Sequence, residues 1–380
     1  MKQHMRWWAL LLVSVLFTAP PCLAAGSSPE AQALIEELGL TEAATPIAKH
    51  PNWKPERVIV MLMPTMGAGS AELEAQFKQA AGDMELVFAR AGFAPTPEAL
   101  AGADAVLGMC TEPLLKNADP GLLWVHNYTV GMDYCTGASE AQLRDVVFTN
   151  NKRLSGPAIA EHAIAMLLAL TRNLPAYNKA QREAAWSMGL AKDVTFGELK
   201  GKTLLVAGLG GIGTEIAWRA HGLGMRVIAT RSSSREGPDF VDYVGLSDEL
   251  PALAAKADVI ANALPLTPQT QGVFNKAVFD AAKPGAIYLS VGRGKTTVTA
   301  DLVAALQAGK LFGAGLDVTD PEPLPKDSPL WSMPNVIITP HVSAAGADSP
   351  QRTMVIAVEN LRRYVAGEPL LNVVDMRKGY

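Results

Sequence analysis

Three side chains of types that can do chemistry lie in the last quarter of this 380-residue chain: Arg293, Glu322 and His341. An arginine guanidinium is a planar double donor that can hold a carboxylate and polarise a neighbouring carbonyl group. A histidine can give and retake a proton near neutral pH, and a carboxylate beside its far nitrogen stabilises the charged ring. Alone, each could be a surface arginine, a turn glutamate or a capping histidine. Together they predict acid–base chemistry on a small carboxylic acid.

Each of these residues follows an apolar run of strand length: Ala286–Val291, Gly313–Val318 and Val336–Thr339. Strand-length runs that alternate with helical stretches are typical of a parallel sheet with helices on its faces. Ligands of such sheets bind outside the carboxyl ends of the strands. We therefore expect the loops that carry the three side chains to face one crevice.

A glycine-rich segment between a predicted strand, Thr203–Gly208, and a predicted helix, Thr214–His221, indicates one ligand. The first glycine permits a tight turn, the second lets the backbone approach a pyrophosphate, and the last allows close packing of helix on strand. The amide groups at the helix start then hold the phosphates. The flanking strand and helix favour a dinucleotide site over an ordinary glycine-rich turn. The predicted contacts are Gly208, Gly210, Gly211, Ile212 and Gly213.

The next predicted strand, Arg226–Thr230, leads into Arg231 and Ser232 rather than into an acidic residue. A carboxylate at this place would bind the ribose hydroxyls of NAD and repel a 2′-phosphate. A guanidinium makes charge-assisted bonds to a phosphate, and a serine hydroxyl adds a donor. The segment predicts NADP(H) as the preferred cofactor, with a solvated basic loop that accepts NAD(H) as the alternative.

The remaining runs divide the chain into two sets of strands. The first set is Arg57–Met63, Met84–Arg90, Asp104–Cys110, Leu122–Tyr128 and Asp145–Thr149, and the second set adds Asp258–Ala263 to the runs named above. Between the sets, the helix predicted from Ala158 to Arg172 is apolar nearly all round, which favours burial between domains. The long helix predicted from Ser349 to Tyr364 would return to the first domain.

From about residue 122 to residue 344 the sequence resembles the D-isomer-specific 2-hydroxyacid dehydrogenase family. The matching stretches are Val130–Asp133, Ala160–His162, the glycine-rich segment, the Arg293 loop, Gly315–Val318, Glu322-Pro323, and Ser328–Trp331 leading to His341. The segment after Arg293 departs from the family pattern, where a small residue usually precedes a valine and an acid. With the strand pattern, the resemblance predicts an α/β fold of two doubly wound parallel-sheet domains. A Rossmann cofactor domain (153–344) would be inserted in a flavodoxin-like substrate domain (26–152 plus 345–380).

The same resemblance implies a role for each site residue. Arg293 would bind substrate, His341 would be the acid and base, and Glu322 would orient the imidazole. The backbone amides of Val130 and Gly131 would hold the substrate carboxylate. The further cofactor contacts would be Leu264, Pro265, Val291, Gly292 and Asp317, the last of these at the nicotinamide amide.

The basic residues after the second cofactor strand resemble the glyoxylate/hydroxypyruvate reductase branch of that family. The expected partners are therefore a small 2-oxo or 2-hydroxy acid and a second copy of the chain in a homodimer. Oxidation of formate or phosphite is a weaker alternative, because the formate branch has a glutamine where Glu322 stands. An exported, non-catalytic NADP-binding partner or sensor is the alternative from another class.

The first 25 residues read as an export signal. Lys2 and Arg6 precede an apolar run, Trp7–Phe17, and small residues follow at Ala24 and Ala25. The run is shorter than the roughly 20 apolar residues of a membrane span. We expect cleavage near Ala25 and a periplasmic or secreted protein without membrane attachment, or a cytoplasmic one if translation starts at a later methionine.

The bulk composition restricts the partners and the redox chemistry. A formal net charge of −4 and a pI near 5.9 leave no basic surface for nucleic acid, and no metal site is expected. The residues from Ala25 to about Lys54 predict a polar arm with a short amphipathic stretch from Glu30 to Leu38. We expect His162 to be a hydrogen-bonded structural residue. After export, Cys110 and Cys135 remain. Buried free thiols are the preferred interpretation, with a single disulfide between them as the alternative.

Overall fold

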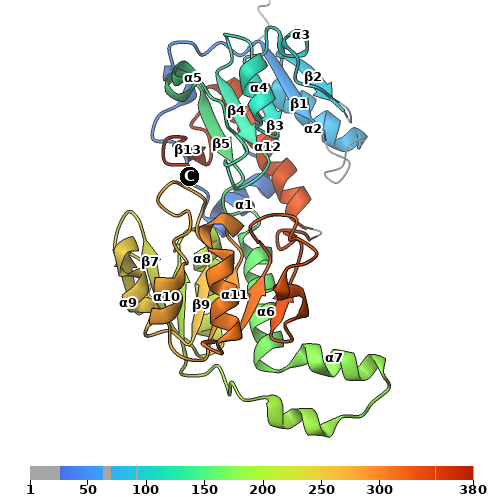
Figure 1. Ribbon diagram of the computed structural model, residues 1–380. Helices are drawn as coiled ribbons and strands as arrows, with labels where there is room; N and C mark the ends of the chain where they lie inside the picture. The colour runs from blue at the N-terminus through green and yellow to red at the C-terminus, as the bar shows by residue number, and fades with distance from the viewer. Residues whose placement is uncertain (1–25, 63–69, 91–92, 347, 380) are drawn as a thin grey trace, which may run out of the picture.

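The computed structural model describes residues 26–62, 70–90, 93–346 and 348–379. The predicted export signal, residues 1–25, lies outside the described residues. The chain forms two lobes, each built around one β-sheet, with a long helical arm that projects from the second lobe (Figure 1).

The first lobe contains a six-stranded sheet in the order β13-β5-β4-β3-β1-β2, in which only β13 is antiparallel. Its strands are β1 (Arg57–Met61), β2 (Glu85–Ala89), β3 (Ala105–Gly108), β4 (Trp124–Asn127), β5 (Val147–Asn150) and β13 (Val373–Val374). Its helices are α2 (Ala71–Ala81), α3 (Pro97–Leu100), α4 (Glu112–Asn117) and α5 (Glu140–Asp145). A serine or threonine at each N-cap accepts a bond from the first turn of these helices. The five predicted runs are the five parallel strands, and their order is that of a flavodoxin-like sheet.

The second lobe contains a fully parallel seven-stranded sheet in the order β12-β11-β10-β9-β6-β7-β8. Its strands are β6 (Thr203–Ala207), β7 (Arg226–Arg231), β8 (Tyr243–Leu246), β9 (Val259–Asn262), β10 (Ala286–Ser290), β11 (Leu311–Leu316) and β12 (Val336–Ile338). Its helices are α8 (Gly211–Gly222), α9 (Leu250–Ala254), α10 (Lys276–Ala281) and α11 (Thr299–Gln307). This is the Rossmann order with one added strand. The short edge strand β8 was not predicted, because it contains a glycine and shows no alternation.

Two helices connect the lobes. The apolar helix α6 (Gly156–Thr171) packs against the second sheet, where Met166 covers Gly315, as its all-round hydrophobicity predicts. The helix α12 (Asp348–Ala366) follows the second sheet in sequence but packs on α2 in the first lobe, as expected for a returning helix. The amphipathic stretch of the predicted arm forms α1 (Pro29–Leu38), which buries Leu38 beside Ile356 of α12.

The helical arm comprises α7 (Leu174–Arg182) and a 3-10 helix, Met188–Asp193, and it extends away from the second sheet (Figure 1). Apolar side chains on it stand in solvent, most of all Trp186, which is 94% exposed. The other 3-10 turns in the part of the chain that the structure describes are Ile47–Lys49, Ser247–Glu249, Gly294–Thr296 and Pro329–Ser332.

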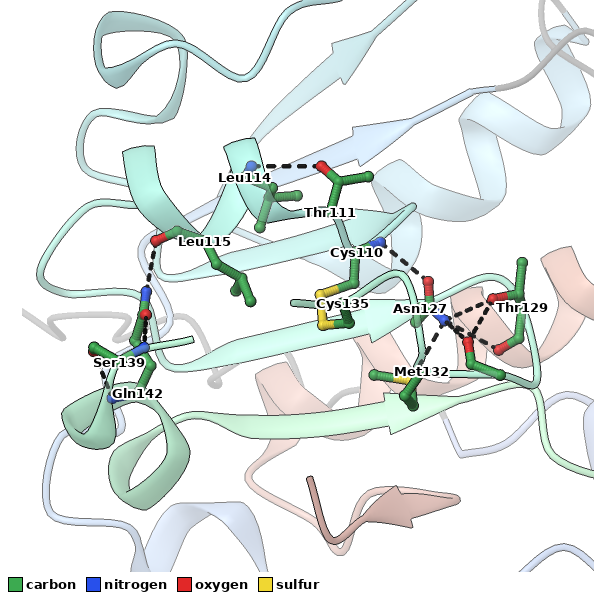
Figure 2. The surroundings of a disulfide bond; sticks show 11 residues. Cys110, Thr111, Leu114, Leu115, Asn127, Thr129, Met132, Cys135, Ser139 and Gln142 are labelled. Atoms are coloured by element: carbon green, nitrogen blue, oxygen red, sulfur yellow. Dashed lines mark hydrogen bonds between the residues drawn. A yellow bond between two sulfur atoms is a disulfide. The ribbon is translucent and has the colours of Figure 1, made fainter. Parts of the chain in front are cut away.

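A disulfide joins Cys110 to Cys135 in the first lobe (Figure 2). The preferred interpretation of two free thiols was therefore wrong, although both residues are buried as expected. Sequence spacing could not reveal the pairing, because 25 residues and a whole strand separate the two cysteines. The fold brings their Cα atoms to 4.8 Å.

Candidate active site

The imidazole of His341 and the carboxylate of Glu322 form a pair in which Nδ1 lies 3.0 Å from Oε2. His341 follows β12 and adopts a left-handed backbone conformation with a φ of 55°, and its N–H donates to the Asp317 carbonyl oxygen. Both side chains of the pair are partly exposed. Since the carboxylate engages Nδ1, the opposite ring nitrogen remains for a ligand.

Asp317, at the end of β11, supports the loop that carries His341. Its buried carboxylate accepts bonds from the Thr339 hydroxyl at 2.6 Å and from the backbone N–H groups of Val342 and Ser343. Burial alone would raise the pKa of Asp317, but these hydrogen bonds outweigh it and hold the pKa below its ordinary value. The predicted contact of Asp317 with a nicotinamide amide stays a prediction.

His162, on α6, takes part in the same network. Its Nε2 lies 2.9 Å from the Thr339 hydroxyl and 3.9 Å from Asp317 Oδ1. The residue is therefore hydrogen-bonded within the protein, in agreement with its expected structural role.

Arg293, after β10, reaches from the second lobe to the first. Its Nε donates to Asp133 Oδ1 at 2.9 Å, and its Nη2 lies against Gly131, where a side chain would displace the guanidinium. The next residue, Gly294, packs on the backbone of Thr319 and Asp320, again without room for a side chain. The Arg293 loop therefore touches the loop that carries Glu322, so all three predicted residues lie at one edge of the sheet.

Opposite Arg293 lies the loop of residues 128–135, called the substrate loop below. Three asparagine side chains hold its carbonyl groups: Asn127 donates to the oxygens of Thr129 and Gly131, Asn150 to that of Val130, and Asn151 to that of Tyr128. Among the described residues, no hydrogen bond engages the backbone N–H of Val130 or of Gly131. These two donors are therefore available to an anion beside the guanidinium.

Sequence reasoning missed the three asparagines. A signal was present, because Asn127 and Asn150 end apolar strands and Asn151 follows directly. A buried amide needs hydrogen-bond partners, and here these are the backbone carbonyls of the substrate loop.

The glycine-rich segment forms the tight turn between β6 and α8. Gly208 has a φ of 91° and packs on Ala263 and Leu264, while Gly213 packs on the carbonyl of Gly208 so closely that no Cβ would fit. Nothing lies within 4 Å of the Cβ position of Gly210, and this N-cap residue provides no side-chain bond to the first amides of α8. The open space beside Gly210, the free amides at the start of α8 and the positive end of the helix dipole together fit a pyrophosphate.

The other predicted cofactor residues extend from this turn toward the catalytic pair. Leu264 contacts Gly208 on one side and Gly292 on the other, so it bridges the ends of β6 and β10. Pro265 follows it, with its carbonyl bound by the Thr270 hydroxyl, and Val291 is buried after β10. Ile212 is partly buried against α6 and the neighbouring core. They therefore follow one another along the carboxyl ends of β6, β9 and β10, which are neighbours in the sheet, and this succession is called the path below.

At the far end of this path, Arg231 ends β7 and donates to the Glu236 carbonyl, and Ser232 follows it. Sequence reasoning missed two further cations, Lys152 and Arg153. Arg153 has a φ of 74°, and its side-chain stem packs on Gly211. Burial and the charges of Arg153 and Arg231 lower the pKa of Lys152. Among the described ion pairs none includes these three cations, which fits an anion such as a phosphate.

The second lobe and its edge residues thus define a dinucleotide-dependent oxidoreductase. Residues 164–343 match the model of the D-isomer specific 2-hydroxyacid dehydrogenase, NAD binding domain. A glyoxylate reductase of Pyrococcus furiosus is 34% identical over 297 residues, which cover 74% of this chain and 86% of that protein. A glyoxylate reductase of Korarchaeum cryptofilum is 32% identical over 73% of this chain and 84% of its own length.

Solved structures agree with these matches. An NADPH-dependent glyoxylate/hydroxypyruvate reductase of Sinorhizobium meliloti, solved with NADP and sulfate, superposes with a TM-score of 0.70 at 28% identity and covers 86% of this chain and all of that one. A family member from Aeromonas salmonicida gives a TM-score of 0.69 at 33% identity, over 84% of this chain and 99% of its own. The chain belongs to the D-isomer specific 2-hydroxyacid dehydrogenase family, in its reductase-like branch.

Neither a metal-binding cluster nor a membrane-spanning helix is present among the described residues. They contain no group of three or more side chains suited to hold a metal ion. None of their helices has the length and hydropathy needed to cross a bilayer.

Proposed function

We propose that this protein reduces a small 2-oxo acid of the glyoxylate or hydroxypyruvate kind to the 2-hydroxy acid, with NADPH as the preferred reductant and NAD(H) as the alternative. One observation carries the proposal: a histidine–carboxylate pair and an arginine stand at the sheet edge that also presents the dinucleotide turn. The named activities of the reductase relatives support the same substrate class.

In the proposed reduction, the substrate loop and Arg293 bind the acid, and His341 with Glu322 transfers the proton. The N–H groups of Val130 and Gly131 and the guanidinium of Arg293 bind the carboxylate, and the guanidinium also polarises the 2-oxo carbonyl. The hydride received by the carbonyl carbon would come from the dihydronicotinamide when the cofactor is bound. His341 donates its proton to the oxygen, and the carboxylate of Glu322 stabilises the imidazolium from which that proton leaves. The products are the 2-hydroxy acid, the oxidised cofactor and a neutral His341.

The cofactor would lie along the path from Arg231 to His341. Gly210 and the first amides of α8 would hold the pyrophosphate, and Arg231, Ser232 and Lys152 would hold the 2′-phosphate. Asp317 and the Leu264-Pro265 segment would border the nicotinamide end. We assign this lobe to residues 153–344 and the substrate domain to 26–152 with 345–380, because α12 and β13 pack on the first sheet.

The test follows NADPH absorbance with a panel of 2-oxo acids. We expect turnover of at least one small acid, and a fall in kcat of about 100- to 10,000-fold in His341→Ala with unchanged NADPH affinity. His221→Ala, at an exposed site on α8, is the matched control and should keep full activity. NADPH binding without turnover of any acid would instead support the non-catalytic sensor.

We also propose a homodimer that uses the helical arm. A single exposed tryptophan is ordinary, but Trp186, Met188 and Leu174 are all exposed on one projecting segment. Light scattering of the wild type should give twice the chain mass. A double substitution, Trp186→Ser with Met188→Ser, should weaken the association, and a wild-type monomer at micromolar concentration would disprove the proposal.

Export to the periplasm or the medium is the remaining proposal. The apolar segment at residues 7–17 and the small residues before residue 26 support it, and so does the disulfide, since such bonds persist mainly in oxidising compartments. Cell fractionation with N-terminal sequencing tests it. We expect a mature chain that starts near Gly26, whereas a cytoplasmic chain with its first residues intact would contradict export.

A further inference from the structure

The disulfide lies directly beside the substrate loop. Cys110 follows β3 and Cys135 closes the substrate loop, and both are almost completely buried, at 1% and 5% exposure. Residue 135 stands two positions after Asp133, the partner of Arg293. The covalent bond therefore fixes the far end of the loop to the end of a central strand.

A chain of hydrogen bonds links Cys110 to the near end of the substrate loop as well (Figure 2). The N–H of Cys110 donates to Asn127 Oδ1 at 3.0 Å, and Asn127 Nδ2 donates to the carbonyls of Thr129 and Gly131. The N–H of Cys135 donates to the Met132 carbonyl at 2.9 Å. Both ends of the loop therefore depend on the position of Cys110.

The substrate loop has no helix or strand of its own to maintain its shape. Residues 128–135 contain no regular element, and Val130, Gly131 and Asp133 are only partly buried. A loop of this kind keeps a fixed geometry only through its attachments, because otherwise each residue regains conformational freedom. The attachments are the asparagine bonds, the Arg293–Asp133 pair and the disulfide.

We propose that the Cys110–Cys135 disulfide is a positioning element for substrate binding. It holds the Val130 and Gly131 N–H groups, and the carboxylate of Asp133, in the geometry that faces Arg293. The affinity for a 2-oxo acid then depends on the oxidised state of the two cysteines, while the affinity for NADPH, whose proposed contacts lie outside the substrate loop, does not. This inference rests on the proposed function for its substrate.

The chemical change that releases the loop is a two-electron reduction. A dithiol reductant transfers two electrons and two protons, the S–S bond breaks, and Cys110 and Cys135 become thiols while the reductant forms its own disulfide. Both cysteines stay in a packed apolar cluster with Val106, Leu114 and Met132, so the core around them need not unfold. The substrate loop loses only its covalent attachment.

The first experiment compares the full-length enzyme before and after reduction with dithiothreitol under native conditions. Mass spectrometry of alkylated peptides that contain Cys110 and Cys135 shows whether these two cysteines form the disulfide or are free thiols. The third cysteine, Cys22, lies on a different peptide and does not affect this result. We expect KM for the acid to rise about tenfold or more on reduction, kcat to change less than threefold, and the fluorescence-measured Kd for NADPH to stay within twofold. Equal KM values in the two states would overturn the inference, as would free thiols in unreduced active enzyme.

The second experiment uses Cys110→Ser with Cys135→Ser, which should show the high KM and no response to the reductant. A response of this variant to dithiothreitol would show that the effect arises elsewhere. Hydrogen–deuterium exchange gives a readout that needs no turnover: reduction should speed exchange at residues 128–135 and leave residues 208–213 unchanged. If no acid is turned over, the proposed function fails, but the exchange result still decides whether the disulfide holds the loop.

Discussion

The turn of residues 208–213 and the substrate loop of residues 128–135 are the two proposed anion sites, and they are held in different ways. The turn is held by glycine contacts within itself and with the adjoining β9 loop. The substrate loop is held by Asn150, Asn151 and a disulfide, in addition to Asn127 beside it. Main-chain packing therefore fixes one proposed anion site, and side chains from other strands, with the disulfide, fix the other.

The strongest test of this difference is Gly213→Ala. A Cβ at this position would collide with the Gly208 carbonyl and the Val206 side chain, so α8 must move away from β6 and its amides must leave the pyrophosphate. We expect NADPH affinity to fall about 100-fold or more, consistent with the close approach that this glycine permits. Gly222→Ala, at the end of the same helix with open space around it, is the control and should bind NADPH normally. Normal NADPH binding by the alanine variant at 213 would show that the turn is not fixed by its main chain.

A second test concerns the adenosine ribose of the dinucleotide. At this end of the cofactor, side chains rather than backbone amides should determine the preference for NADPH over NADH. In Arg231→Asp a carboxylate replaces the guanidinium at the end of β7, so it repels a 2′-phosphate and accepts bonds from ribose hydroxyls. We expect the ratio of kcat/KM for NADPH to that for NADH to fall about 100-fold. The KM for the acid should stay unchanged, since the substrate loop is untouched. An unchanged cofactor ratio would refute the phosphate-binding role of Arg231.

The same contrast explains what could be predicted from the sequence. The strands of the second sheet other than β8, the glycine turn, and the His341–Glu322 pair were predicted, because local patterns at strand ends encode them. The pairing of Cys110 with Cys135 and the Asp133–Arg293 contact were not, because only the folded topology brings those residues together. Lys152 and Arg153 were missed for another reason: a basic dipeptide in a connecting loop looks like solvated surface.

A third test removes one attachment of the substrate loop. In Asn127→Ala the carbonyls of Thr129 and Gly131 lose their donor, and the N–H of Cys110 loses its acceptor. We expect KM for the acid to rise about tenfold, because loss of such buried bonds costs about 1–3 kcal/mol. Asn150→Ala, which removes the bond to the Val130 carbonyl and the bond from the Lys152 N–H, should have a smaller effect on KM in the same direction. The NADPH Kd should be unchanged in Asn127→Ala, and a loss of NADPH affinity in this variant would mean that the two anion sites are not held independently.

The smallest expected effect concerns the loop that carries His341. Like the substrate loop, it is bound by a side chain from another strand end, here that of Asp317. The Asp317 carboxylate binds the Thr339 hydroxyl and the N–H groups of Val342 and Ser343, so Asp317→Asn should lower the free energy of unfolding by about 1–3 kcal/mol at pH 7. Because the pKa of Asp317 in the folded protein lies below its ordinary value of 3.8, the native state binds the proton less readily than the unfolded chain. The stabilisation is therefore complete above this ordinary value and is lost as the pH falls through the folded pKa. Urea unfolding at pH 7 and below about pH 4 measures the difference in the free energy of unfolding between wild type and variant. This gap should narrow at the lower pH. The control Asp327→Asn, at an exposed position, should show no gap at either pH. A gap that is the same at both pH values would mean that the charge of Asp317 does not hold the His341 loop, and that this loop, like the glycine turn, is fixed by its main chain.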